Sequence, residues 1–356
     1  MRHRWCVVAS CPMLLLAAAA MAQPPSYGID FVTIGDPGNA PSFVPDPGGV
    51  SFTEGRGTVG YEFRIGRMET TTAQWMEFVN TYSTMGGFDL FGRPSSWGGE
   101  VDPTYSGPGL RYRLRVSIPN AAMVPVLGIG WRTCAQYCNW LHNAKAPTVA
   151  AIASGAYDAS TFTTNPTNPP TFNDQWTRSP GAKFWIPSLD EWMKATHYDP
   201  NRNGPGQGGW WMYPHGSDTP LVYGPPGQGQ ANAGFTLPSQ GQSYIPLGSY
   251  PDVLSPYGLI DAAGAAQEWM EEVLFPTRPT HRGIGGSGAR GTTELTDRVT
   301  RFEGSSPIST NGTGDYPIGL RIASVIPAPS AFAAFAPLIS VLVIRRKRQV
   351  ARLCHD

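Results

Sequence analysis

Two of the five cysteines lie in the central part of the chain and could supply thiol chemistry there. Three of the five cysteines lie near its ends: Cys6, Cys11 and Cys354. Cys134 and Cys138 remain, and a spacing of four residues places both thiols on one side of a helix. They share this apolar side with Tyr137 and Leu141, and free cysteine is commonly a small buried hydrophobe. We therefore favour a core role, with a redox or metal role as the alternative, and expect no disulfide framework.

The histidines show no spacing typical of metal ligands. Those outside the two ends of the chain are His142, His197, His215 and His281. A structural metal site usually has ligands a few residues apart in pairs. We therefore expect each imidazole to be solvated or held by a single hydrogen bond.

The N-terminal residues 1–22 have the pattern of a secretory signal peptide. Arg2 and Arg4 precede an apolar run over residues 6–20, and Ala20-Met21-Ala22 is a small-x-small cleavage site. The pattern predicts that the protein is exported. A buried N-terminal helix and lipidation at Cys11 are the alternatives.

The C-terminal residues 326–356 carry a second targeting pattern. Pro327-Ala328-Pro329-Ser330 precedes fourteen residues of apolar character, 331–344, and the basic cluster 345–348 follows. This end resembles a PEP-CTERM sorting signal, with Pro-Ala-Pro in place of Pro-Glu-Pro. The resemblance implies an exosortase-type processing enzyme as a partner and an initial position of the apolar segment in the inner membrane. A plain tail anchor is the alternative, and the basic cluster would stay on the cytoplasmic side.

The composition indicates a globular protein with many loops. The 356 residues include 42 glycines and 35 prolines, and only 15% of them are charged. Eleven tryptophans and 41% hydrophobic residues argue against disorder. This combination excludes a coiled coil, a collagen-like fibre and a multi-span membrane protein.

The net charge of zero conceals an acidic central part. The whole chain has 26 basic and 26 acidic residues, but residues 1–22 and 345–356 contain seven of the basic residues and one of the acidic ones. Residues 23–344 therefore carry 19 basic and 25 acidic residues, a net charge of about −6. We expect no nucleic-acid partner, because such proteins present a basic surface.

Three helices and two strands can be predicted from local patterns. Capping boxes mark the helices that follow Thr71, with Gln74, and Ser188, with Glu191. A further apolar repeat predicts a helix from about Trp131 to His142. Strands are expected at residues 31–34 and 61–65, whereas residues 144–181 and 199–230 have loop-like composition.

Six segments, in this order, resemble the sulfatase-modifying-factor family, whose members are also called formylglycine-generating-enzyme-like domains. These segments are residues 61–80, 125–141, 184–195, 257–269, 282–287 and 319–323. The resemblance implies an α+β, C-type-lectin-like fold that is loop-rich and has little regular secondary structure. We place this domain at residues 57–325 and expect residues 23–56 to form an N-terminal strand and loop segment that packs on it.

The resemblance also implies a chemistry that this sequence lacks. The founding activity of the family converts a sulfatase cysteine to formylglycine with a copper-binding cysteine pair that follows a Gly-Gly-Ser block. Counted from Ser287, the pair would fall at Arg290 and Leu295, and no cysteine lies between Cys138 and Cys354. Without thiolates there is no soft site for Cu(I). We therefore expect no copper, and no iron because the histidine-bearing helical domain of the ergothioneine-synthase branch is missing.

A calcium site is the better retained feature of the family. By resemblance, a side-chain oxygen, two main-chain carbonyls and a glutamate would bind the ion: Asp261, Gly264, Ala266 and Glu268. Calcium accepts main-chain carbonyls whatever the side chain is. The alternative is that Glu268 pairs with an arginine such as Arg321 in the core. A second family calcium site would begin near Asn232 and Ala233.

These expectations together favour a function without catalysis. We expect an exported domain of the cell envelope or extracellular surface, membrane-tethered or surface-sorted, that acts as a binding or envelope module. Its ligand would be a peptide or a glycan, and the aromatic segment 209–213 is a candidate binding rim unless it packs on the core. The alternative is an oxidoreductase of the formylglycine-generating type that acts on exported sulfatases.

Overall fold

The computed structural model describes residues 24–83, 97–107, 110–233, 245–273, 279–289, 294–308 and 318–326. Residues 26–326 form one unit, and the two ends of the chain are grouped in a second, of which only Pro24 and Pro25 are described. The signal peptide predicted at residues 1–22 and nearly all of the tail predicted at residues 326–356 lie outside the described residues.

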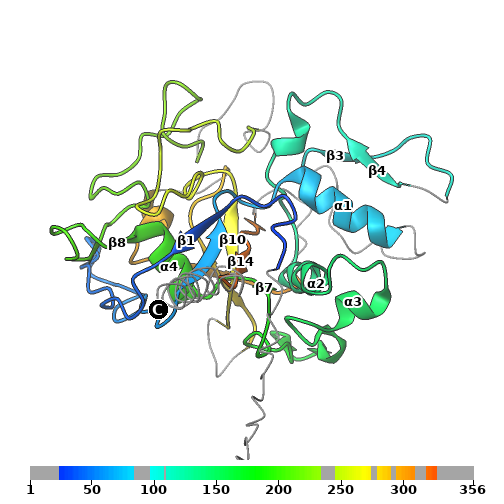
Figure 1. The fold of residues 1–356 in the computed structure, drawn as a ribbon, viewed down its shortest axis with the longest axis horizontal. Helices are drawn as coiled ribbons and strands as arrows, with labels where there is room; N and C mark the ends of the chain where they lie inside the picture. The colour runs from blue at the N-terminus through cyan, green and yellow to red at the C-terminus, as the bar shows by residue number, and fades with distance from the viewer. Residues whose placement is uncertain are drawn as a thin grey trace, which may run out of the picture. The chain divides into compact units, whose positions relative to one another are not determined.

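An antiparallel sheet joins strands from the two ends of the described unit. Its order is β1 (Phe31–Ile34), β2 (Phe63–Gly66), β14 (Ala323–Ser324) and β7 (Phe184–Trp185). The strand predicted at residues 31–34 is confirmed, and the one predicted at residues 61–65 begins two residues later. The N-terminal segment thus pairs directly with the main body (Figure 1).

A second sheet positions the candidate site. Its order is β12 (Glu303–Ser305), β11 (Arg282–Gly285), β10 (Gln267–Val273) and β13 (Ile318–Gly319). Strand β10 is antiparallel to β11 and parallel to β13, with Glu268 opposite Gly319. This register brings the residues after Gly319 close to the start of β10.

The three predicted helices are confirmed as α1 (Thr72–Ser83), α2 (Trp131–His142) and α4 (Leu189–His197). Both capping boxes form: Thr71 N donates to Gln74 Oε1 at 3.0 Å and Gln74 N to Thr71 Oγ1 at 3.3 Å, and Ser188 and Glu191 make the same reciprocal pair. These helices therefore begin where their own side chains satisfy the first backbone N–H groups.

Short elements interrupt the segments that were expected to be loops. Residues 144–181 contain helix α3 (Val149–Ala153), capped by the Thr148 side chain, and the strand pair β5 (Thr164–Asn165) and β6 (Thr171–Phe172). Residues 199–230 contain part of the pair β8 (Tyr198–Asp199) and β9 (Gly209–Trp210). Such elements are too short to show a sequence period.

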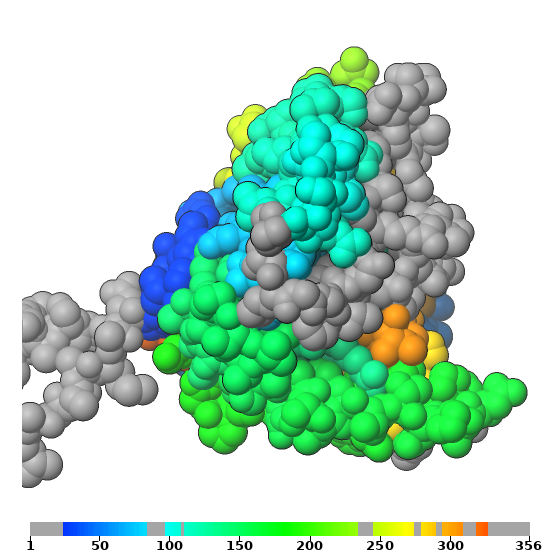
Figure 2. All heavy atoms as spheres, turned by 90° about the vertical axis from the view of Figure 1, so that its right-hand side faces the viewer, coloured from blue at the N-terminus to red at the C-terminus, as the bar shows by residue number. Residues whose placement is uncertain are grey.

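The remaining regular pieces complete a mixed, loop-rich architecture. They are the hairpin of β3 (Gly99–Val101) and β4 (Tyr112–Leu114) and the 3₁₀ turns Ala121–Met123, Ala159–Thr161 and Glu294–Asp297. The hairpin lies above the green residues 150–180 on the side drawn in Figure 2. The α+β fold with little regular secondary structure is confirmed. None of the described helices has the length and apolar character needed to span a membrane.

An aromatic core fills the space between the helices and sheets. Trp75, Trp131 and Trp269 are fully buried in the same cluster as Cys134 and Cys138. Burial raises the pKa of both thiols well above the usual value, which disfavours the nucleophilic thiolate. The core role predicted for this pair is confirmed.

Candidate functional site

A buried ion pair lies at the centre of the candidate calcium site. Arg321 Nε donates to both carboxylate oxygens of Glu268 at 3.0 Å, and Arg321 Nη2 donates to Glu268 Oε1 at 2.7 Å. Trp192 Nε1 donates to Glu268 Oε2 at 2.8 Å. Both charged side chains are buried. The alternative predicted from the sequence, a core pair between Glu268 and Arg321, is thus present.

The remaining donors of Arg321 bind main-chain carbonyls. Nη1 donates to Gly66 O at 3.0 Å and to Arg67 O at 2.7 Å, and Nη2 to Ile260 O and Asp261 O, each at 3.2 Å. Burial alone would lower the pKa of this guanidinium, but the charge and hydrogen bonds of Glu268, together with the charges of Glu69 and Asp261, raise the pKa. Arg321 therefore ties β2, the loop before β10 and β10 itself together.

Side chains from distant segments hold the loop 261–266. Asn232 Oδ1 accepts from Ala265 N at 2.6 Å, Ser287 Oγ from Gly264 N at 2.8 Å, and Glu69 Oε1 from Ala266 N at 3.1 Å. The segment proposed to begin a second calcium site thus lies against the loop of the first. Ala265 adopts a left-handed conformation with φ of 47°, which these three bonds to the loop help to hold.

Three of the four predicted calcium ligands lie in this loop and Glu268 lies on β10, and the set fits calcium only in part. Asp261 Oδ2 accepts from Gly248 N at 2.6 Å, and burial raises the Asp261 pKa to about 6. The Glu268 carboxylate is engaged by Arg321, so a bound calcium ion would compete with a guanidinium. Within the described residues, no cluster of three or more His, Cys, Asp or Glu side chains is placed to hold a metal ion. Calcium binding stays a prediction.

Glu69 is a site residue that the sequence reasoning missed. Its side chain is buried, and its Oε2 has no hydrogen-bond partner among the described residues. Burial, followed by repulsion from the Glu268 charge, raises the pKa of Glu69 well above its usual value. Its separation from residues 261–268 in sequence hides this proximity. The only local signal is a carboxylate in the Met68-Glu69-Thr70 stretch that follows β2.

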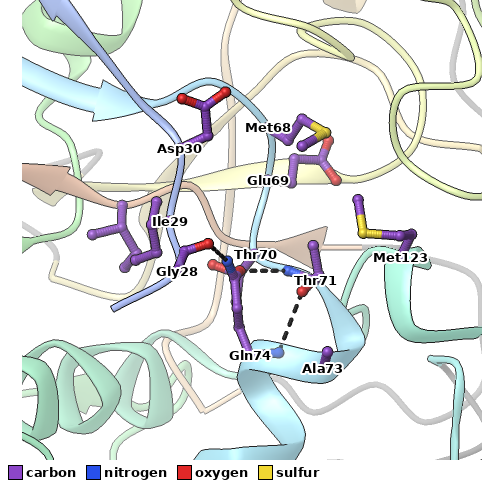
Figure 3. A pocket seen from close by; sticks show the side chains of 11 residues that line it. Gly28, Ile29, Asp30, Met68, Glu69, Thr70, Thr71, Ala73, Gln74 and Met123 are labelled. Carbon is purple, nitrogen blue, oxygen red and sulfur yellow. Dashed lines mark hydrogen bonds between the residues drawn. The ribbon is translucent and has the colours of Figure 1, made fainter. Parts of the chain in front are cut away.

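A pocket of about 270 Å³ lies beside Glu69, between the segment 28–30 and the start of α1 (Figure 3). In that view the Glu69 carboxyl group points toward the space between Met68 and Met123. Gln74 closes one side by donating from Nε2 to Gly28 O at 3.2 Å. The described lining residues include two carboxylates, Asp30 and Glu69, and no basic side chain.

Side-chain oxygen atoms bind the backbone at Ser287, just before the positions where the family resemblance places the cysteine pair. We call this place the Ser287 corner. Ser287 N donates to Asp297 Oδ1 at 2.8 Å, and Tyr223 OH donates to Asp297 Oδ2 at 2.7 Å. Burial raises the pKa of Asp297 to about 6. Leu295 is exposed, and Arg290 lies outside the described residues. Asp297 is a second residue that the sequence reasoning missed.

The expectation for the histidines holds for two of them and is wrong for His197. His142 Nδ1 accepts from Lys183 N at 3.2 Å, and His281 Nδ1 shares a 2.7 Å bond with Thr280 Oγ1. His197 is fully buried at the end of α4, and neither ring nitrogen has a partner among the described residues. Burial lowers its pKa to about 3. A charged imidazole is too costly there, so the ring packs as a neutral side chain.

The aromatic segment 209–213 packs on the core, which is the alternative predicted for it, and it also borders a pocket. Trp210, Met212 and Tyr213 are buried against the core. The same three side chains line a pocket of about 510 Å³, together with residues of the segment 43–47 and the side chains of Arg202 and Asp218. The segment is therefore a floor rather than a free rim.

The chain resembles known proteins over most of its length. The family model described as the sulfatase-modifying factor enzyme 1-like domain matches residues 52–324. Among solved structures, the chain is similar to Treponema denticola variable protein 1, with 17% identity, a TM-score of 0.48 and coverage of 83% of this chain and 95% of the other. It is also similar to CarF, with 17% identity, a TM-score of 0.51 and coverage of 84% and 99%. No curated protein matches. At this identity the likeness to CarF concerns the fold alone.

Proposed function

The chain belongs to the sulfatase-modifying factor family, and on this premise we propose that it is an exported binding or envelope module without formylglycine-generating activity. The observation that carries the proposal is the lack of any cysteine between Cys138 and Cys354. The family's oxidation needs a thiolate pair, and neither Arg290 nor Leu295 supplies one.

The two thiols of the domain are poor substitutes for that pair. Cys134 and Cys138 lie on the buried side of α2, in the core, where a peptide substrate has no access. Their raised pKa values disfavour the thiolate that Cu(I) requires. The Ser287 corner offers hard oxygen atoms of Asp297 and Tyr223 instead.

The cellular placement of the module rests on the two ends of the sequence. Residues 1–22 would direct export, and residues 326–356 would hold the protein in the inner membrane until an exosortase-type enzyme acts on the tail. The domain would then face the cell envelope or the extracellular surface. The net charge of about −6 on residues 23–344 argues against a nucleic-acid ligand.

Calcium is proposed as a structural ion of the loop 261–266. Asp261 and the carbonyls of Gly264 and Ala266 would supply hard oxygen ligands. Glu268 would contribute only by sharing its carboxylate with Arg321. The ion would therefore act on stability and not on a reaction.

The experiment that decides catalysis uses the purified full chain, Cu(I), oxygen and a cysteine-containing sulfatase peptide. We expect mass spectrometry to find the peptide thiol unconverted and the protein free of tightly bound copper. The double variant Arg290→Cys/Leu295→Cys is the matched control, because it restores thiols at the two family positions and should gain Cu(I) binding. Conversion of the peptide by the wild-type chain would establish the alternative, an oxidoreductase that acts on exported sulfatases.

A further inference from the structure

We propose that the pocket above Trp210, Met212 and Tyr213 binds a neutral saccharide of disaccharide size. The inference rests on the proposed function, because it names the ligand class of the binding module. The pocket of about 510 Å³ lies between the N-terminal segment 43–47 and the loop that follows α4. Small-ligand sites commonly have volumes of about 300–1,000 Å³.

The floor of the pocket is rigid and apolar. Trp210 packs against the Tyr198 ring at a centroid distance of 5.1 Å, and its Nε1 donates to Ala40 O at 3.0 Å. Tyr213 OH accepts from Arg298 Nε at 3.3 Å. These contacts fix the floor before any ligand binds, which lowers the entropic cost of binding.

One aromatic ring at the pocket is left open to solvent. Phe43 is 67% exposed and lines the same pocket as Val44, Pro45 and Pro47. An exposed phenyl ring offers a flat apolar face with a negative quadrupole. The C–H face of a pyranose ring is complementary to such a surface.

The polar groups of the pocket are prearranged by one arginine. Arg202 donates through Nη1 to Trp210 O and through Nη2 to Asp218 Oδ2, while its guanidinium lies 4.3 Å from the centroid of the Trp211 ring. Asp218 Oδ1 accepts from Met212 N at 3.1 Å. The Asp218 side chain is still 55% exposed, so its carboxylate keeps lone pairs for ligand hydroxyl groups.

The charge balance of the pocket favours a neutral ligand with hydroxyl groups. Arg202 and Asp218 cancel each other, so an ionic ligand would meet an opposing charge beside each attractive one. A purely apolar ligand would cover the floor of the pocket. It would also bury the Asp218 carboxylate without giving it a hydrogen-bond donor, which costs free energy. A saccharide satisfies both parts, since it has C–H faces and hydroxyl edges.

The test is ligand-detected NMR of the full chain with maltose, cellobiose, lactose and N,N′-diacetylchitobiose. We expect at least one of them to bind with a Kd of about 1 mM. Phe43→Ala should weaken binding about tenfold. Asp218→Asn should weaken it as well, because the amide keeps the Met212 contact but loses the charge. Phe52→Ala is the matched control: Phe52 is 56% exposed on the same N-terminal segment, lies against Arg301, and does not line the pocket.

Two results would overturn the inference. One is no binding of any of the four sugars at about 20 mM to protein with native circular dichroism. The other is sugar binding that Phe43→Ala leaves unchanged. These results leave the proposed lack of formylglycine formation standing, because the peptide oxidation assay decides that separately.

Discussion

Glu268 and Arg321 are 53 residues apart in sequence and form a buried ion pair in which the guanidinium contacts both carboxylate oxygens. Strand β13 makes this possible, because Gly319 pairs with Glu268 and Arg321 follows only two residues later. The pair lies where the family resemblance places a calcium ligand. The Arg321 guanidinium thus supplies part of the positive charge that a metal ion would bring to Glu268.

Breaking the pair should destabilise the fold strongly. In Glu268→Ala the Arg321 charge would stay buried without its carboxylate, and such changes cost about 3–5 kcal/mol in the free energy of unfolding. Urea denaturation measures this loss. Arg113→Ala, which removes a partly exposed partner of Glu100, should cost at most about 1 kcal/mol. Equal losses in the two variants would contradict the central role of the buried pair.

Calcium should raise the melting temperature if the loop 261–266 binds it. An ion that binds only the folded state stabilises it by about 2.7 kcal/mol at a concentration of 100 times the Kd. Thermal melts of the wild type with calcium and with a chelator measure the effect, and Asp261→Ala together with Glu268→Ala should abolish it. If neither calcium nor the chelator changes the melting temperature of the wild type, the calcium site is refuted.

Glu271 should make the fold less stable as the pH rises toward neutrality. Burial raises the pKa of this carboxyl to about 7, so the folded state holds its proton more tightly than the unfolded state. The resulting stability is complete below the unfolded pKa of about 4.3 and is lost between there and about 7. Glu271→Gln should therefore lose less stability than the wild type when urea midpoints at pH 5 and 7.5 are compared. An unchanged difference between the two pH values would refute this contribution.

His197 should make the fold less stable as the pH falls, which is the opposite of the effect of Glu271. Its folded pKa of about 3 lies below the ordinary value, so the unfolded state takes up a proton more readily. Stability that is present above about pH 6.5 is then lost as the pH falls toward 3. His197→Phe should flatten this acid limb in urea midpoints at pH 7, 6 and 5. The slope is compared rather than the absolute stability, because the larger ring changes packing at every pH.

The helices could be predicted from the sequence because their signals are local. Thr71 with Gln74 and Ser188 with Glu191 satisfy backbone donors within one turn of their own helix. The apolar repeat around Cys134 and Cys138 correctly indicated the buried side of α2. Helix α3 was missed, since five residues hold too little of a period to be recognised.

The site was only partly predictable. The family resemblance indicated Asp261, Gly264, Ala266 and Glu268 as one site, and in the structure the first three lie in the loop 261–266 while Glu268 lies on β10. The bonds from Asn232, Ser287 and Glu69 to that loop come from three other segments. No local pattern announces such contacts, because they depend on how separate strands and turns pack.

The sequence alone determined the family, the fold class, the capped helices and the lack of a thiolate pair at the family's positions, because these depend on residue identity and short-range order. Only the tertiary structure decided that Arg321 binds Glu268, and that the aromatic segment 209–213 lines a pocket. It also decided that Glu69 and His197 are buried with atoms that have no hydrogen-bond partner in the described part of the chain. Burial and charge pairing arise when distant segments exclude water together, and that is a property of the packed chain.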